Sequence, residues 1–386
     1  MMDSVNNAAV VMAGCPDTHL SLYRRIQFTV HDPVALIELD AGNRKFLILR
    51  DIEMERARQF ARVTDVHCPP DFSPAEGLSG DRATATAQAT AECLRRNDVK
   101  VVRGDRLLPL VYVDAIRRAG IEVEYDSDLG VTDRRQKTEE EVEHLREAQR
   151  VTEEAVAMVC QTIARSEANA NGELVSNGQI LSSEFLRLEV EKFLLEKGYG
   201  GSPAIIAGGP GAADCHWLGY GPIKTSEPVI VDIFPKNQST HYCGDCTRTV
   251  VHGDVPDEVV RMHAAVADAK AEAIAAIKAG ATGESVHQAT EEALTSHGYQ
   301  VGLPMEGDSD SYCAMICGTG HGIGLEVHEP PLLDYKGPEL LVGDALTVEP
   351  GLYCRAIGAI RLEDMVIVRE SGSENLNTLP KGLDWK

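Results

Sequence analysis

The stretch HGIGLEVHEP, from His321 to Pro330, places two histidines seven residues apart in glycine-rich surroundings. Four acidic residues stand in short motifs on either side of it: Asp232 in VDIFP, Asp245 in GDCTRT, Glu349 in TVEPGLY and Glu363 in IRLED. Carboxylates with a single imidazole form an oxygen-rich ligand set, which suits manganese, cobalt or iron(II) better than a thiolate-selected ion. Two such ions ~3.5–4 Å apart can activate water and polarise a carbonyl. The pattern therefore predicts a site for two divalent metal ions and hydrolytic chemistry.

In their order and sequence context, these residues resemble the pita-bread metallopeptidases, which include methionine aminopeptidases, Xaa-Pro aminopeptidases and prolidases. The resemblance covers roughly Thr138 to Arg369, and it is carried by GDCTRT, GHGIGLEVHEPP, TVEPGLY and IRLED. The chain departs from the family pattern at one place. The two aspartates are thirteen residues apart, whereas the family more often has a shorter spacing. We expect the extra length to lie in the turn Pro235–Thr240, where it displaces neither aspartate.

The resemblance implies a role for each metal ligand. Asp232 would chelate one metal, and Asp245 and Glu363 would bridge both. His321 would be the sole imidazole ligand. Glu349 would be a terminal ligand that also moves the proton of the nucleophile, a hydroxide that bridges the metals. The implied cofactor is a pair of divalent ions, with manganese expected first and cobalt, iron(II) or zinc as alternatives.

Three polar residues stand close to these ligands in the sequence, namely Asp364, Arg361 and Thr247. Asp364 offers a second carboxylate beside Glu363, but strand alternation allows only one of the two to face the metals. The match to IRLED selects Glu363. Arg361 should point the same way as Glu363, where a contact with a ligand, a substrate carboxylate or a structural ion partner is open to it. Thr247, two residues after Asp245, is a candidate to orient a ligand by a hydrogen bond.

Two histidines resemble catalytic residues of the family that are not ligands. His328, in VHEP, resembles the histidine that stabilises the scissile carbonyl and the tetrahedral intermediate by electrostatics. His216, in ADCHWLGY, resembles the histidine that lines the substrate cleft, and it stands sixteen residues before the first aspartate. A packed or solvent-exposed loop histidine is the alternative for His216, because its context is less specific. The expected catalytic set is therefore His216, His328 and Glu349.

Composition excludes several classes of partner. The 386-residue chain has 60 acidic and 37 basic residues, a net charge of −23, which argues against nucleic acid and anionic membranes. A transmembrane helix needs ~18 consecutive apolar residues, and the sequence has no apolar run of that length. No basic residue precedes the apolar run AAVVMAG, so a secretory signal is not indicated and a cytoplasmic location is expected. The ten scattered cysteines are expected to be reduced.

The length favours two domains. Residues 1 to about 30 are weakly patterned and are expected to contain a loose arm. The runs Pro33–Leu39 and Lys45–Arg50 predict a hairpin, and Ala83–Arg96 predicts a helix of a small α/β domain. We place the boundary near VTDRRQK. The expected domains are an N-terminal creatinase-like α/β domain at 1–135 and a catalytic domain at 136–386.

The catalytic domain contains an internal repeat. Thr138 and Glu141 form a capping box at the start of its first helix. Two helices are expected in each half, at Glu139–Arg165 and Ser183–Lys197, then at Asp257–Ala279 and Gly283–His297. Strand-like segments follow each pair of helices, which predicts a pseudo-twofold α+β fold, the pita-bread fold of the resemblance. The two aspartates then belong to the first half, and the other metal ligands belong to the second.

The function expected is a metallo-aminopeptidase that removes an N-terminal residue standing before proline. The fragment around His216 resembles the Xaa-Pro branch of the family. Prolidases often place an arginine, which holds the substrate carboxylate, between the second histidine and EPG. Here Glu329–Val348 contains no arginine and only Lys336. This favours an Xaa-Pro aminopeptidase over a strict Xaa-Pro dipeptidase, although Arg355 and Arg361 lie just beyond and could substitute.

Two other classes are open. A metal-free creatinase-like or non-catalytic relative shares the fold, but such relatives typically lack part of the ligand set, which is complete here. A thiol redox protein would rest on Cys243 and Cys246, and no second C-x-x-C supports it. The partners expected are peptides with proline second and a second copy of the chain, because related enzymes are often dimers.

Overall fold

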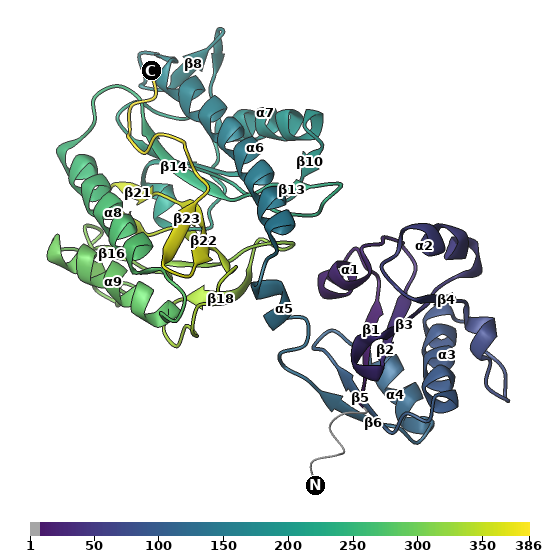
Figure 1. Ribbon diagram of the computed structural model, residues 1–386. Helices are drawn as coiled ribbons and strands as arrows, with labels where there is room; N and C mark the ends of the chain where they lie inside the picture. Colours follow the sequence, from purple (N-terminus) through teal and green to yellow (C-terminus); the bar gives the residue numbers. More distant parts are fainter. Residues whose placement is uncertain (1–7) are drawn as a thin grey trace. The chain divides into compact units, whose positions relative to one another are not determined.

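The computed structural model describes residues 8–386, which form two compact units divided between Arg134 and Arg135 (Figure 1). The first unit is built on a six-stranded sheet of order β4-β3-β2-β1-β5-β6. Its strands are β1 (Ala9–Gly14), β2 (Val34–Leu39), β3 (Arg44–Ile48), β4 (Asp65–His67), β5 (Val101–Gly104) and β6 (Glu122–Tyr125). The helices are α1 (Leu20–Ile26), α2 (Met54–Phe60), α3 (Arg82–Arg96) and α4 (Leu110–Arg118), with α5 (Thr132–Arg135) at the boundary.

A loose arm was expected within residues 1 to about 30, but residues 8–30 form a strand and a helix instead, and residues 1–7 lie outside the described residues. Ala9–Gly14 is a central strand that pairs antiparallel with β2 and parallel with β5. Val11 belongs to the core on one face of the sheet, with α3 and α4, and Met12 to the core on the other, with α1 and α2. A strand covered on both faces is apolar throughout. It therefore lacks the alternation that marks a half-exposed strand.

The second unit contains four long helices close to the positions expected from the sequence. They are α6 (Glu139–Ala164), α7 (Ser183–Glu196), α8 (Asp257–Ala276) and α9 (Gly283–Ser296). The capping box at the start of α6 is formed. Glu141 N donates to Thr138 Oγ1 at 3.3 Å, and Thr138 N donates to Glu141 Oε2 at 2.8 Å. None of the helices in residues 8–386 has both the length and the hydrophobicity needed to cross a bilayer.

Three sheets make up most of the remaining structure of the second unit. The first, of order β11-β12-β14, consists of β11 (Ile205–Gly208), β12 (Pro228–Ile233) and β14 (Cys246–Val251). The second, β18-β17-β19-β22-β23, consists of β17 (Gly320–Gly322), β18 (Glu329–Leu333), β19 (Ala345–Val348), β22 (Asp364–Arg369) and β23 (Gly372–Asn375). The third, β15-β16-β20-β21, consists of β15 (Gln300–Val301), β16 (Cys313–Met315), β20 (Gly351–Cys354) and β21 (Gly358–Arg361). Short strands form two smaller sheets, namely β7 (Glu167–Ala168), β8 (Leu174–Ser176) and β9 (Gln179–Ile180), and β10 (Tyr199–Gly200) with β13 (Lys236–Asn237).

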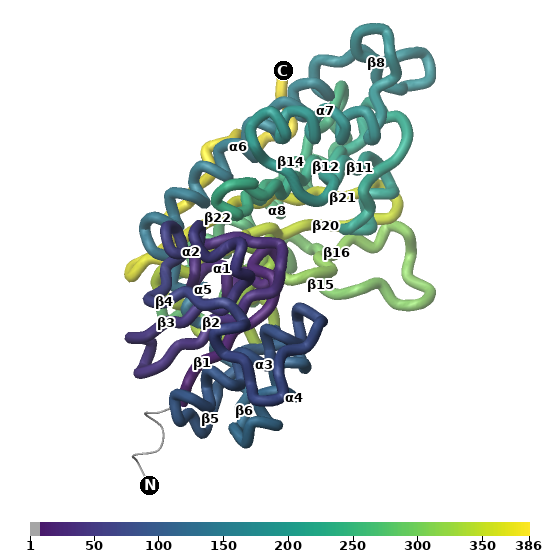
Figure 2. The backbone as a smooth tube through the Cα atoms, turned by 90° about the vertical axis from the view of Figure 1, so that its right-hand side faces the viewer, coloured from purple at the N-terminus to yellow at the C-terminus, as the bar shows by residue number. Residues whose placement is uncertain are grey.

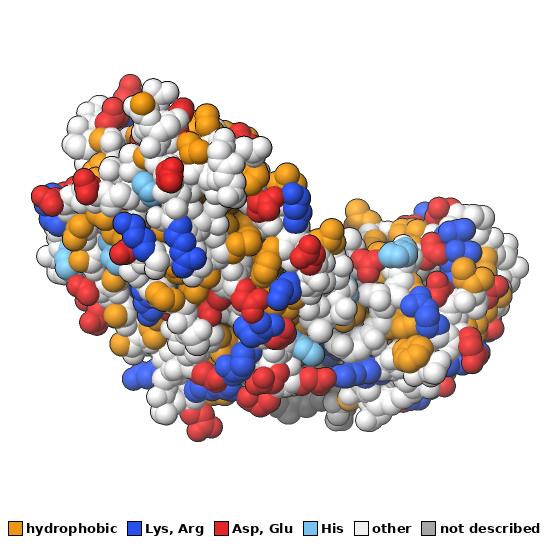
Figure 3. All heavy atoms as spheres, turned by 90° about the horizontal axis from the view of Figure 1, so that it is seen from above, with side chains coloured by type: hydrophobic (Ala, Val, Ile, Leu, Met, Phe, Trp, Pro, Cys, Tyr) orange, Lys and Arg blue, Asp and Glu red, His pale blue; other side chains and the backbone are white. Residues whose placement is uncertain are grey.

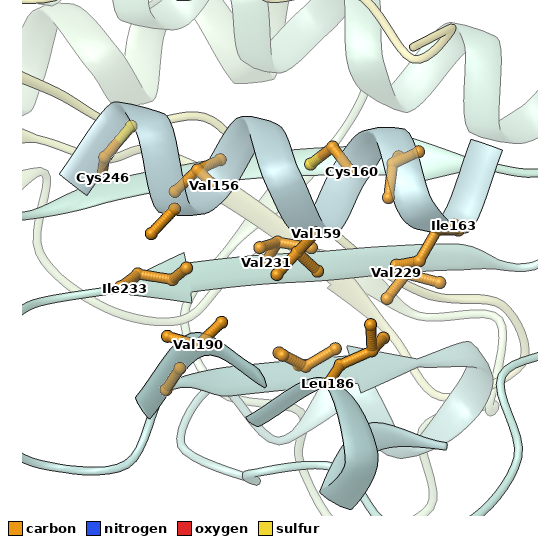
Figure 4. Packing of buried hydrophobic residues seen from close by; sticks show 14 of the residues in the cluster. Val156, Val159, Cys160, Ile163, Leu186, Val190, Val229, Val231, Ile233 and Cys246 are labelled. Atoms are coloured by element: carbon orange, nitrogen blue, oxygen red, sulfur yellow. The ribbon is translucent and has the colours of Figure 1, made fainter. Parts of the chain in front are cut away.

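Each half of the second unit packs helices on strands. In the first half, α6 lies across β12 and β14, and α7 packs on β11 (Figure 2). Figure 4 shows α6 side chains such as Val159 and Ile163 pointing towards Val229 and Val231 of β12. In the second half, α8 packs on β21 and β19, and α9 packs on β18. The predicted pseudo-twofold α+β architecture is confirmed.

A short hydrogen-bonded turn lies between the two aspartates, in the segment expected to contain the extra length. Asn237 N donates to Tyr242 O at 3.0 Å, and Asn237 Oδ1 accepts from Ser239 N and Thr240 N at 2.8 and 2.9 Å. This turn lies between the end of β12 at Ile233 and the start of β14 at Cys246. Asp232 keeps its register opposite Thr247.

The face of the molecule shown in Figure 3 carries acidic, basic and apolar side chains interspersed with one another. On that face, the cations are not gathered into a single basic surface of the kind that nucleic-acid binding requires.

Candidate metal centre

A cavity of about 400 Å³ in the second unit brings the predicted site residues together. It is lined by eight of them, namely His216, Asp232, Asp245, His321, His328, Glu349, Arg361 and Glu363. Thr247 is not part of the lining, but its hydroxyl donates to Glu363 Oε2 at 2.8 Å. The cavity thus joins side chains from both halves of the pseudo-twofold fold.

The carboxylates lie at strand ends. Asp232 is the second-last residue of β12, and Asp245 directly precedes β14. Glu349 directly follows β19, and Glu363 lies in the break between β21 and β22. At strand ends the backbone is released from the regular ladder, so the side chains of separate strands can converge. Asp245 thus lies just outside β14 itself.

His321 is the middle residue of β17, between two glycines. A Cβ on Gly320 would lie 2.1 Å from Thr347 O, and one on Gly322 would lie 2.4 Å from Pro330 O. These glycines therefore let the neighbouring backbones pack closely against β17, which holds His321 from both sides. His321 Nδ1 is 3.0 Å from Gly322 O, which leaves Nε2 to face the carboxylates.

The tightest donor group consists of Asp245, His321 and Glu363, whose ligand atoms lie within 4.8 Å of one another. His321 Nε2 lies 3.9 Å from Asp245 Oδ2 and 3.2 Å from Glu349 Oε1. Asp232 lies outside the tightest group, but its Oδ1 is buried and has no hydrogen-bond partner among the described residues. Buried polar atoms are nearly always satisfied, so an oxygen left over in such a cavity is available to a cation.

The carboxyl groups are strongly perturbed. Burial and the neighbouring Glu363 charge raise the pKa of Asp245 well above its usual value. Burial and the charge of Glu349 raise the pKa of Glu363 to about 8. Burial also raises the pKa of Asp232, against the opposing charge of Arg361. Four carboxylates this close together, three of them buried, cannot all be ionised without cations between them. The donor set therefore fits divalent metal ions, which would supply that positive charge.

Glu349 and His321 behave as a pair. Burial disfavours the charge on each, but their mutual hydrogen bond and the attraction of the surrounding opposite charges together outweigh it. The pKa of His321 is raised to about 9, and the pKa of Glu349 is lowered. Without metal, the imidazole of His321 and the carboxylate of Glu349 share a proton. A bound metal would replace that proton.

Arg361 takes one of the three roles that the sequence left open. Its Nη2 lies 2.5 Å from Asp232 Oδ2, and its Nε donates to Thr247 Oγ1 at 3.2 Å. Its Nη1 donates to Tyr353 Oη at 3.0 Å and to Cys215 O at 3.3 Å. Arg361 is buried, and all three of its nitrogens are occupied by the protein. The side chain therefore supports the ligands instead of facing a substrate carboxylate.

Asp364 turns away from the cavity. It is fully buried and lies 2.8 Å from Arg248 Nη2 and 2.9 Å from Lys270 Nζ. These cations outweigh the effect of burial and lower the pKa of Asp364 to about 2. Arg248 Nη1 also donates to the backbone oxygen of Glu363. This network was missed from the sequence, because its members come from separate elements with no shared motif.

Both candidate histidines are on the wall of the cavity. The ring of His328 lies edge-on to that of His321, with centroids 4.3 Å apart. Burial and the neighbouring His321 lower the pKa of His328, so its imidazole is neutral at pH 7. His216 is exposed in the loop before β12, and its backbone N–H donates to Asp214 Oδ1 at 3.1 Å. Sequence reasoning missed Asp334, Tyr353 and the two cysteines Cys215 and Cys317, which also line the cavity.

The C-x-x-C pair has the properties of structural thiols. Cys243 Sγ lies 3.7 Å from Leu325 O, and Cys246 Sγ lies 3.8 Å from Glu363 O. Both are buried, and burial raises the pKa of the Cys246 thiol well above its usual value. A thiol with a raised pKa is a poor nucleophile, which argues against the redox alternative.

Known proteins resemble this chain in sequence. Residues 143–370 match the sequence profile of metallopeptidase family M24. Over 314 residues, the chain is 31% identical to Xaa-Pro aminopeptidase 1 of Streptomyces coelicolor, covering 74% of this chain and 60% of that protein. Over 252 residues, it is 29% identical to the Xaa-Pro dipeptidase of Pyrococcus furiosus, covering 64% of each chain. The chain thus spans less than two thirds of the length of these curated relatives.

The fold also matches solved structures over nearly the whole chain. The Xaa-Pro dipeptidase from Bacillus anthracis superposes with a TM-score of 0.77 at 24% sequence identity, covering 99% of this chain and 96% of that one. At this identity the likeness shows the fold. It includes the N-terminal unit as well as the unit that carries the cavity.

Proposed function

Because the chain belongs to metallopeptidase family M24, we propose that it is a dinuclear metallo-aminopeptidase. It hydrolyses the peptide bond after an N-terminal residue that is followed by proline. The metal ligands are Asp232, Asp245, His321, Glu349 and Glu363, and manganese is the proposed metal because four of the five donors are carboxylates.

One observation carries the proposal: several buried carboxylates converge on a cavity that contains too little positive charge to balance them. Asp232, Asp245 and Glu363 all have raised pKa values. The oxygen Asp232 Oδ1 has no hydrogen-bond partner among the described residues. Such an arrangement is costly in a folded protein unless a ligand compensates it. A complete donor set also argues against a metal-free creatinase-like or non-catalytic relative.

The chemistry divides between the metals and the protein. When bound, two divalent ions would polarise the scissile carbonyl and make a water molecule more acidic. Glu349 accepts the proton that the attacking water loses and delivers it to the proline nitrogen, which leaves as an amine. Neutral His328 donates a hydrogen bond to the carbonyl oxygen as negative charge develops there. Arg361 and Thr247 hold Asp232 and Glu363 in place.

The site has two candidate substrate classes, namely longer peptides with proline at the second position and Xaa-Pro dipeptides. One observation favours the longer peptides. The sequence-similar relatives include both an Xaa-Pro aminopeptidase and an Xaa-Pro dipeptidase. A strict dipeptidase needs a cation for the substrate carboxylate. In the described residues, Arg361 is the only arginine or lysine that lines the cavity, and its nitrogens are occupied. We therefore favour the aminopeptidase and keep the dipeptidase as the second candidate.

We also propose a role for the first unit, a homodimeric assembly and a cellular location. The unit before Arg135 serves as a creatinase-like domain that contributes to substrate access, and the enzyme acts as a homodimer. A cytoplasmic location is supported by the ten cysteines, all of which are free thiols in the described chain.

The test combines metal analysis with a peptide panel. Protein purified without added metal is loaded with manganese, and the bound metal is counted by elemental analysis. Hydrolysis is then compared for Xaa-Pro-Xaa-Xaa and Xaa-Ala-Xaa-Xaa peptides. We expect close to two ions per chain and a strong preference for proline at the second position. Full activity in chelator-treated protein, or no preference for proline, would contradict the proposal.

A further inference from the structure

The side chain of Asp334 is a fifth carboxylate in the cavity wall, in addition to the four of the proposed ligand set. It directly follows β18, and its side chain is 40% exposed, which places it where the cavity meets solvent. Tyr335 N donates to Asp334 Oδ1 at 2.7 Å. A Cβ on Gly318 would lie only 3.1 Å from Asp334 Oδ2, so glycine at 318 leaves the room that this carboxylate occupies.

Asp334 decides the net charge of the metal-loaded cavity. Five carboxylates and one arginine line it in the part of the chain that the structure describes. Two divalent ions would balance the four carboxylates of the ligand set. The positive charge of Arg361 then remains, and the negative charge of the nucleophilic hydroxide matches it. The loaded cavity would therefore be close to neutral without Asp334, and the carboxylate of Asp334 makes it negative, which disfavours an anionic group.

The groups around Asp334 do not neutralise its negative charge. His287 Nε2 lies 3.6 Å from Asp334 Oδ1 but nearer, at 3.3 Å, to Glu291 Oε1. Its other ring nitrogen, Nδ1, lies 3.0 Å from Thr319 Oγ1. One histidine thus faces two carboxylates, so it cannot neutralise both.

We propose that Asp334 is a specificity-determining residue that excludes substrates with a free carboxylate on the residue after the scissile bond. This inference rests on the proposed function and extends it. Asp334 lines a cavity of about 400 Å³, so the carboxylate of a dipeptide bound there would lie in the range of its charge. Charges closer than the ~8 Å Debye length of physiological salt are only partly screened. The preferred substrates are peptides in which proline is followed by a further residue, or by an uncharged amide.

The test compares one Xaa-Pro dipeptide with its C-terminal amide, which differs only in that charge. We expect wild-type kcat/KM to be higher for the amide. Asp334→Asn should lower the amide-to-acid ratio about tenfold, mainly by raising kcat/KM for the acid. Added salt should reduce the ratio in the wild type and leave it nearly constant in the variant. Asp254→Asn, an exposed aspartate in the turn after β14, is the matched control and should keep the wild-type ratio.

Binding separates this inference from the proposed function. The ligand is an Xaa-Pro analogue whose scissile carbonyl is reduced to methylene, prepared as acid and as amide, and its Kd is measured by calorimetry on manganese-loaded protein. Tighter binding of the amide, lost in Asp334→Asn, supports the inference even if no peptide is hydrolysed, an outcome that would overturn only the proposed function. An equal loss of binding or kcat/KM for acid and amide in Asp334→Asn would show that Asp334 contacts another part of the substrate, and would overturn the inference. An unchanged ratio would also overturn it.

Discussion

The guanidinium of Arg361 lies 2.5 Å from the carboxylate of Asp232, and both side chains are buried. This ion pair leaves one oxygen of Asp232 directed to the cavity without a hydrogen-bond partner among the described residues. Asp232 is therefore held by a cation on one side and remains open to a second cation on the other. The stability of the metal-free site should depend on this pair.

Replacing Arg361 with methionine keeps much of the side-chain volume and removes the charge. An uncompensated buried carboxylate costs about 3–5 kcal/mol, so the free energy of unfolding of chelator-treated protein should fall by that order. Manganese should restore part of the loss, because it supplies charge to the same carboxylate. Chemical denaturation with and without metal measures both quantities. Lys192→Ala, which removes an exposed ion pair with Glu189, should change stability by less than ~1 kcal/mol. An equally small effect of Arg361→Met would contradict the role given to this pair.

Replacing Asp245 with alanine should remove a carboxylate from the tightest donor group. We expect the number of bound manganese ions to fall below two and most activity to be lost, while the circular dichroism spectrum changes little. Elemental analysis and hydrolysis of an Xaa-Pro peptide measure the two effects. Retention of wild-type activity in this variant would rule out the dinuclear mechanism.

Replacing His328 with alanine should act on the transition state. His328 lies beside His321, but its proposed role is to stabilise developing charge. kcat should therefore fall about 10²–10³-fold, the scale for loss of one such donor, and the metal content should stay the same. If metal is lost together with activity, His328 is a ligand and the assignment is wrong.

Stabilisation by metal should increase with pH. The pKa values of Glu363 and His321 are raised to about 8 and about 9 in the folded, metal-free protein. Such groups contribute stability below their unfolded pKa values and lose it as pH rises through the folded ones. Metal binding requires their deprotonated forms, so it competes with protons at low pH. The Tm difference between manganese-loaded and chelated protein should grow from pH 5 to pH 9. A Tm difference that is constant over this range would contradict the raised pKa values of Glu363 and His321.

Local sequence was sufficient for several features of the fold. The helix α6 begins where Thr138 and Glu141 form their capping box, because capping depends on residues three positions apart. The strand β1 was missed for the opposite reason. Ala9–Gly14 is buried on both faces, and an apolar run without alternation does not reveal its partners until a sheet covers it.

The chemical types and the order of the candidate ligands follow from the sequence alone, because short motifs such as GDCTRT and IRLED carry them. The sequence left the role of Arg361 open and gave no signal for Asp334. The direction of Arg361 depends on Asp232, Thr247 and Tyr353, which reach it from separate strands. The role inferred for Asp334 depends on the other charged residues that line the same cavity. Electrostatic interactions depend on distance through space, and only the tertiary structure brings residues a hundred positions apart into that range.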